Sequence, residues 1–146
     1  MEPLDAGLRF RLRRTARQIA QQHQSIREIV ASLERSLRDG HGGSDAVRGV
    51  YARYREAVAA HFLLEQDVLF PALHGLHPDR RRELEALEAE HGDFTARLGA
   101  LGELLASAPL PEFGAGFERL AREMAGHESR EERLAQALAD RIEGEG

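Results

Sequence analysis

The sequence predicts an all-α protein, an up-down-up-down antiparallel four-helix bundle. Four long segments carry apolar residues at helical spacing, and three breaks rich in glycine or proline separate them. No segment alternates apolar and polar residues with the period of two that a half-buried strand requires. At 146 residues the chain is long enough to bury a real core, and we expect a single domain over residues 1–146.

The first expected helix runs from about Asp5 to Arg38. It stops at Asp39–Gly43, a glycine-rich stretch that no helix would tolerate. Ser44 or Asp45 then offers a side-chain oxygen to cap the second helix. The face of the first helix repeats every three or four residues: Leu12, Ala16, Ile19, His23, Ile26, Val30, Leu33 and Leu37.

The second helix should be kinked, or lose its regular geometry, at Pro71. A further break at Gly75–Asp79 opens the third helix, with Pro78 near its first position. The face that we expect to be buried on the second helix comprises Val47, Val50, Tyr51, Tyr54, Val58, His61, Leu64, Glu65, Val68 and Leu69.

The third helix is followed by a break at Ala108–Pro111 and by a glycine-containing start of the fourth helix at Phe113–Gly116. The face of the third helix comprises Leu84, Leu87, His91, Phe94, Thr95, Leu98, Leu101 and Leu105. The face of the fourth comprises Phe117, Leu120, Met124, His127, Glu131, Leu134, Leu138 and Ile142.

Six side chains inside these apolar faces are candidate metal ligands. They form two copies of one pattern, a lone His followed later by His-x-x-x-Glu: His23, His61 and Glu65, then His91, His127 and Glu131. Residues at i and i+4 differ by only about 40° around a helix, so each His-Glu pair points at one small volume. One lone His is more often a hydrogen-bonded core residue than a ligand, but six titratable groups on inward faces would be costly to bury without a metal.

The donor set narrows the choice of metal. Nitrogen and carboxylate without sulfur suit iron, manganese or zinc, and six donors suit two ions that share carboxylates better than one tetrahedral zinc. The Glu-x-x-His pattern of ferritin-like bundles is absent, and so is the His-Glu-x-x-His of zinc proteases.

These residues resemble the hemerythrin-like (HHE cation-binding) domain family over nearly the whole chain. The likeness lies in His61-Phe62-Leu63-Leu64-Glu65, continuing to Leu69-Phe70-Pro71, with lone His23 and His91 and the late His127-x-x-x-Glu131. The resemblance implies two iron ions joined by an oxo or hydroxo group. His23 and His61 would bind one iron, His91 and His127 the other, and Glu65 and Glu131 would bridge them.

The chain departs from the hemerythrins that carry oxygen. Those proteins have a fifth histidine where this chain has Thr95, and a carboxylate five residues after the last histidine, where it has Glu132. Because i+5 lies about 140° off the face, helical geometry favours Glu131 and leaves Glu132 solvated. The pattern resembles a branch with four His and two Glu, which includes sensing, repair and peroxide-handling proteins.

Three functions stay open. The first is a di-iron protein that reacts with oxygen, peroxide or nitric oxide, and the second is a non-enzymatic iron- or oxygen-sensing or iron-holding module that signals to a partner. The third is a bundle that binds no metal. Tyr54 could donate its hydroxyl near the metal or be an ordinary core residue, Thr95 could bond a bound oxygen species or lie on a plain helix face, and Glu88 could orient His91. We expect His41, His74 and His77 at the surface.

Composition excludes several other classes. A net charge of −5 argues against nucleic acid, and the absence of Cys excludes disulfides, thiolate metal sites and cysteine nucleophiles. No stretch is long and apolar enough to span a membrane, so we expect a soluble cytoplasmic protein, a monomer or weak homodimer whose ligand is a small diatomic or a peroxide. All 20 basic residues are Arg, which is typical of a GC-rich bacterial genome.

Overall fold

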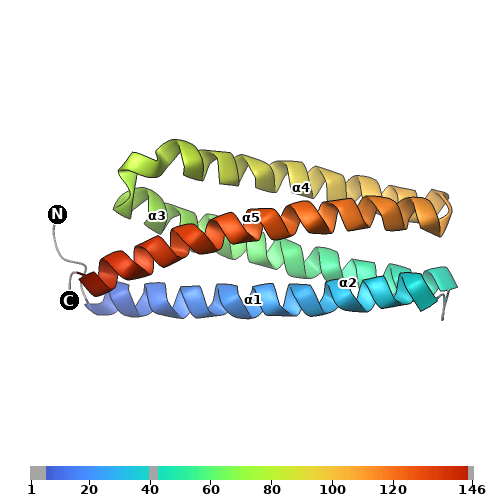
Figure 1. The fold of residues 1–146 in the computed structure, drawn as a ribbon, viewed down its shortest axis with the longest axis horizontal. Helices are drawn as coiled ribbons and strands as arrows, with labels where there is room; N and C mark the ends of the chain where they lie inside the picture. Colours follow the sequence, from blue (N-terminus) through green and yellow to red (C-terminus); the bar gives the residue numbers. More distant parts are fainter. Residues whose placement is uncertain (1–5, 40–42, 145–146) are drawn as a thin grey trace.

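The structure, a computed structural model, describes residues 6–39 and 43–144, and these residues form helices and no strand (Figure 1). The prediction of an all-α bundle is therefore confirmed. The elements are α1 (Ala6–Asp39), α2 (Gly43–Leu64), the π-helical turn η1 (Glu65–Leu69), α3 (Phe70–Leu76), the 3₁₀ turn η2 (Pro78–Arg80), α4 (Arg81–Ser107) and α5 (Leu110–Gly144).

The long helices α1, α2, α4 and α5 lie side by side (Figure 1). Helix α1 packs against α2 and α5, and α4 packs against α2 and α5, so each long helix has two lateral neighbours. The inward faces of all four meet along the centre of this arrangement. The alternation of helix direction along the chain stays a prediction.

Two helix starts differ from the sequence-based expectation. Ser44 and Asp45 lie inside the first turn of α2, which begins at Gly43, so neither caps it. Helix α5 begins at Leu110, and Pro111 is accommodated because the N–H groups of a first turn need no helical acceptor. Gly116 lies within α5, where a Cβ would come within 2.7 Å of the Leu101 side chain on α4. The absence of a side chain there lets the two helices approach closely.

The second helix changes its winding before Pro71 and does not stop there. Regular α-helix ends at Leu64, Glu65–Leu69 form a π-helical turn, and Phe70 donates its N–H to Glu65 O, five residues back. Proline donates no hydrogen bond, and its ring clashes with the carbonyl four residues earlier. A wider turn directly before Pro71 relieves this conflict and lets the helix continue as α3. Glu65, a predicted ligand, is the first residue of this turn.

Two apolar clusters fill the centre of the bundle. The larger cluster includes Leu33, Tyr54, Phe62, Phe94 and Phe117, and the smaller one Leu12, Ile19, Phe70, Leu84 and Leu134. Three histidines of the candidate site, His23, His91 and His127, fall in sequence between a member of one cluster and a member of the other, as His23 does between Ile19 and Ile26 on α1. His61 follows Val58 and precedes Phe62, both of the larger cluster. In the described part of the chain, no helix is both long enough and apolar enough to cross a bilayer.

Candidate metal centre

The six side chains singled out from the sequence meet inside the bundle. His23 comes from α1, His61 from α2, Glu65 from η1, His91 from α4, and His127 and Glu131 from α5. Each has at most 1% of its surface exposed. We call these six residues the candidate metal centre.

The six residues divide into two overlapping groups whose ligand atoms lie within 4.8 Å of one another. One group is His23, His61, Glu65 and Glu131, and the other is Glu65, His91, His127 and Glu131. In the first group the Nε2 atoms of His23 and His61 are 3.0 Å apart. In the second, the Nε2 atoms of His91 and His127 are 3.1 Å apart. Each group could hold one metal ion.

The two carboxylates belong to both groups because each lies near histidines of both pairs. Glu65 Oε1 is 2.9 Å from His61 Nε2 and 3.5 Å from His91 Nε2. Glu131 Oε1 contacts His127 Nε2 and lies 3.2 Å from His91 Nε2, while its Oε2 is 3.9 Å from His61 Nε2. A carboxylate so placed has one oxygen available for each of two neighbouring cations.

Nδ1 of each histidine contacts a polar side chain that comes from a neighbouring helical segment of the bundle. Gln22 on α1 accepts from His61, Glu90 on α4 from His127, and Glu132 on α5 from His23, at Nδ1–oxygen distances of 2.9, 2.5 and 3.0 Å. The amide of Gln66, in η1, lies 3.3 Å from His91 Nδ1. We call Gln22, Gln66, Glu90 and Glu132 the outer partners. Each candidate ion would thus have one histidine with a carboxylate partner and one with an amide partner.

The outer partners determine which nitrogen faces inward without a proton. Because Nδ1 of His23 and His61 donates to an oxygen, Nε2 of each neutral ring carries a lone pair. The lone pairs of His23 and His61 therefore face each other at 3.0 Å, which is repulsive unless a cation lies between them. His127 contacts Glu90 through Nδ1 and Glu131 through Nε2; burial lowers the pKa of His127, but these two carboxylates raise it above the usual value, so its inward nitrogen must lose a proton before it can bind a metal. The donor set fits a pair of metal ions, which imidazole nitrogen and carboxylate oxygen bind well.

The carboxylates provide a second test of this fit. Both oxygens of Glu65 and Oε2 of Glu131 are buried without a hydrogen bond to any described residue. An ionised carboxylate in that state is expensive, and either a proton or a coordinated cation would relieve the cost. The orphaned oxygens are therefore compatible with cation binding.

Burial also controls the charge of the centre when no metal is bound. Burial and the neighbouring Glu131 raise the pKa of Glu65 to about 11, so this carboxyl is protonated at neutral pH. Burial opposes ionisation of Glu131 too, but hydrogen bonds from His127 and His91 hold its pKa below the usual value. Burial, followed by the proximity of His23, lowers the pKa of His61 to about 3. His61 is therefore neutral and Glu131 ionised.

Comparison with known proteins agrees with this donor set. The family model of the hemerythrin HHE cation-binding domain matches residues 14–140, which is most of the chain and contains all six residues. The chain belongs to the hemerythrin HHE cation-binding domain family. Comparison with curated proteins and with solved structures gives no significant match. A hemerythrin-like domain with buried His and Glu clusters fits a cation-binding module.

Aromatic rings surround the second histidine pair of this hemerythrin-like domain. Phe62 stacks on His91 with ring centroids 4.0 Å apart, and Phe94 meets the His127 ring edge-on at 5.3 Å. These contacts, together with the outer partners, fix ring orientation on both sides of the imidazoles. The histidines are held in place before any cation binds.

Three predictions about other side chains near the domain's centre were wrong or incomplete. Glu88 does not orient His91: its Oε1 lies 2.6 Å from His74 Nε2, because position 88 faces α3, whereas Glu90 contacts the centre. His77 is buried, with 6% of its surface exposed, since it joins α3 to η2 through backbone hydrogen bonds to Leu73 and Arg80. His74 is half-buried, and His41 lies outside the described residues.

The structure also places the residues whose roles the sequence left open. Tyr54 is a fully buried core residue, but its hydroxyl has no hydrogen-bond partner among the described residues. Thr95 is exposed, and its hydroxyl donates to His91 O within α4, as on an ordinary helix face. Glu132 is 54% exposed, as its register predicted, yet it also accepts from His23.

Sequence reasoning missed three of the outer partners, Gln22, Gln66 and Glu90. A signal for them exists, because each is the immediate sequence neighbour of a candidate ligand: His23, Glu65 and His91. A neighbouring residue lies about 100° further around the helix, where it faces the flank of the next helix. Each outer partner therefore serves a histidine on a different helix from its own.

Proposed function

We propose that this chain is a non-haem di-iron protein with up-down-up-down helices, which reacts with oxygen, peroxide or nitric oxide. His23 and His61 would hold one iron, His91 and His127 the other, and Glu65 and Glu131 would bridge them. We further propose that it acts in the cytoplasm as a monomer or weak homodimer.

The observation that carries the proposal is the pair of overlapping four-residue groups that share both carboxylates. A single metal would leave one pair of facing imidazoles at about 3 Å without a cation. Two metals would satisfy all four nitrogens and the orphaned carboxylate oxygens at once. The chemistry of the donors supports two ions over one.

Iron, rather than manganese or zinc, is supported by family membership together with a donor set free of sulfur. Two histidines and two shared carboxylates give each ion four protein donors, fewer than the six of octahedral coordination. Bound iron would supply redox chemistry and open coordination positions for a small ligand.

The protein's own groups would orient the metal and handle protons. The outer partners keep three Nδ1 atoms protonated, so that Nε2 is the atom of each ring that would bind metal. His91 needs one adjustment, because the Gln66 amide nitrogen now faces its Nδ1. Rotation of that amide would bring the oxygen to Nδ1 and free Nε2 of His91. The Glu65 proton would leave as metal binds.

Metal analysis with an absorption spectrum of the purified chain tests the proposal. We expect about two irons per chain, from the two donor groups, and charge-transfer bands that disappear on reduction with dithionite. His61→Ala should lose iron, whereas His74→Ala, which changes a histidine paired with Glu88 outside the centre, should retain it. If wild type and His61→Ala held equally little iron under iron-replete expression, the di-iron proposal would fail.

The alternative is a non-enzymatic iron- or oxygen-sensing module that signals to a partner. Iron-dependent folding without consumption of peroxide or binding of nitric oxide would favour that module. Turnover at a rate above that of free iron would favour the reactive centre.

A further inference from the structure

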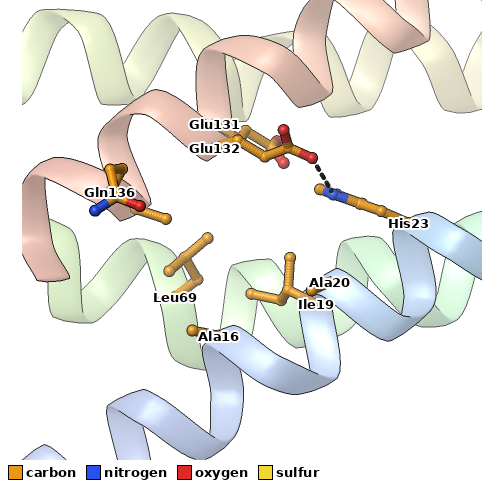
Figure 2. Close-up of a pocket in the computed structure, with 9 residues that line it drawn as sticks. Ala16, Ile19, Ala20, His23, Leu69, Glu131, Glu132 and Gln136 are labelled. Carbon is orange, nitrogen blue, oxygen red and sulfur yellow. Dashed lines mark hydrogen bonds and ion pairs between the residues drawn. The ribbon is translucent and has the colours of Figure 1, made fainter.

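A cavity of about 310 Å³ lies between α1, α5 and the π-helical turn, directly beside the candidate metal centre, and it opens to solvent where the exposed Ala16, Ala20 and Gln136 line it. We call it the α1–α5 cavity. His23 and Glu131 line one part of it, and Figure 2 shows Glu131 beside Glu132, whose carboxylate is bonded to His23. The cavity therefore reaches two of the six candidate ligands from the side.

The rest of the cavity wall is largely apolar. Ala16 and Ile19 of α1, Leu69 of η1 and Ala135 of α5 line it. Figure 2 shows Leu69 on the side away from His23, with Ile19 between them and the polar Gln136 of α5 on the side of Leu69. Leu69 and Ile19 are buried members of the smaller apolar cluster. One region of the cavity thus suits a hydrocarbon body, and the other suits a group that forms hydrogen bonds.

The cavity is much larger than a diatomic gas or hydrogen peroxide requires. A water molecule occupies about 30 Å³ in the liquid, so a two-atom ligand needs only a small part of 310 Å³. Pockets that enclose small organic ligands begin at about 300 Å³. The volume fits an organic molecule of several carbon atoms.

The side chains around the metal-free cavity favour a neutral ligand. No arginine is among the described residues that line it, and the ring of its histidine, His23, is already bonded to Glu132, so no lining side chain is free to pair with an organic acid. Apolar walls penalise any charge that is not paired.

We propose that the α1–α5 cavity binds a small neutral organic molecule with an apolar body and one polar head, such as an alcohol, a phenol or an alkyl hydroperoxide. The body lies against Ile19, Leu69 and Ala135, and the head lies beside His23 and Glu131. The proposal deepens the proposed function, on which it rests for the statement that the head meets a metal centre. Binding in the cavity itself does not depend on metal.

Equilibrium dialysis with radiolabelled 1-hexanol, an unreactive member of this class, tests the proposal on the full chain. We expect the chelator-treated chain to bind about one hexanol molecule saturably, and to bind hexanoate at least about tenfold more weakly, because the carboxylate finds no partner of opposite charge there. Equal binding of hexanol and hexanoate would overturn the preference for a neutral ligand.

Two filling variants locate the binding site. Ala135→Phe from α5 and Ala16→Phe from α1 should each weaken hexanol binding by about tenfold or more, because the ring occupies the volume of the ligand. Ala125→Phe is the matched control, since Ala125 is exposed on α5 and does not line the cavity. Thermal unfolding identifies a variant that fails to fold, and the other variant then decides. Unchanged binding in a folded filling variant would contradict the assignment.

Dialysis of the iron-loaded and the chelator-treated chain separates this inference from the proposed function. Hexanol binding by a chain that takes up no iron would leave the cavity assignment standing and reject the di-iron centre. If the chain bound iron but neither the iron-loaded nor the chelator-treated form bound hexanol, the di-iron centre would stand and the cavity assignment would be rejected.

Discussion

Glu90 on α4 and His127 on α5 are joined through Oε2 and Nδ1 at 2.5 Å, and Arg130 donates to the other oxygen of the same carboxylate at 2.8 Å. Burial opposes ionisation of Glu90, but the hydrogen bonds from His127 and Arg130 hold its pKa below the usual value. An ionised carboxylate therefore accepts the Nδ1 hydrogen bond of His127, which makes Nε2 of this ring a stronger electron-pair donor to a metal ion.

Replacement of this carboxylate should weaken metal binding without removing a ligand. We expect Glu90→Gln to lower metal affinity by about 10- to 100-fold, the usual effect of losing a partner that orients a ligating histidine. The measurement is competition for iron or manganese against a chelator of known affinity. Glu88→Gln, two positions earlier on α4 and paired with His74, is the matched control and should leave affinity unchanged. Equal effects of the two variants would contradict the role of Glu90.

Metal binding should release at least one proton near neutral pH. Without metal, Glu65 keeps its proton at pH 7, because its pKa is raised to about 11, and it must lose that proton to become a ligand. His61, whose pKa is lowered to about 3, is already neutral and adds no proton in this range. Burial lowers the pKa of His127, but Glu131 and Glu90 raise it above the usual value, so this ring can release a further proton. Affinity should therefore rise with pH, by at least about tenfold per unit between pH 6 and 8.

Calorimetric titration of manganese(II) in two buffers with different ionisation enthalpies measures this proton release directly. A binding enthalpy that is the same in both buffers would show that no proton leaves, and would reject the protonated state of Glu65.

Removal of the hydroxyl from each of the two buried tyrosines should change the free energy of unfolding in opposite directions. Tyr51 donates to Leu98 O at 2.5 Å, so Tyr51→Phe should lower the free energy of unfolding by about 1 kcal/mol. The Tyr54 hydroxyl is buried without a partner among the described residues, so Tyr54→Phe should raise it by about 1 kcal/mol. Denaturant unfolding of the metal-free proteins measures both. A change in the iron absorption spectrum of Tyr54→Phe would instead assign that hydroxyl a role at the centre.

Thr95 should have no part in metal binding. Its side chain is exposed and bonds the backbone of its own helix, so Thr95→Ala should change iron content and affinity by less than about twofold. Iron analysis and chelator competition check this. Loss of iron comparable to that of His61→Ala would show that position 95 reaches the centre after all.

The helices and the six inward residues could be predicted because they depend on short-range periodicity. His23 and Glu131 each occur at helical spacing among apolar residues of their own helix. The sequence alone therefore indicates that each lies on the inward face of that helix. The structure brings the six together as that periodicity predicted, while metal binding itself stays a prediction.

The outer partners and the cavity could not be predicted in the same way, because they depend on contacts between helices. The relation of Gln22 to His61 is set by how α1 packs on α2, which periodicity does not specify. The error for Glu88 has the same origin, since two positions on one helix, 88 and 90, face different neighbours. The burial of His77 reflects a junction between two short turns, where no periodic pattern exists.

The π-helical turn Glu65–Leu69 adds one residue to the otherwise regular helix that runs from α2 into α3. Before it, the buried positions Tyr51, Val58 and Glu65 follow one another at heptad steps, and the next one, Leu73, comes a residue late. Deletion of one residue from the turn would rotate everything beyond it by about 100° relative to His61. Leu73 could then no longer pack in the smaller apolar cluster while Glu65 stayed between the two histidine pairs. The number of residues in this single turn therefore sets the rotation of α3, which packs in the apolar cluster, relative to α2, which carries His61.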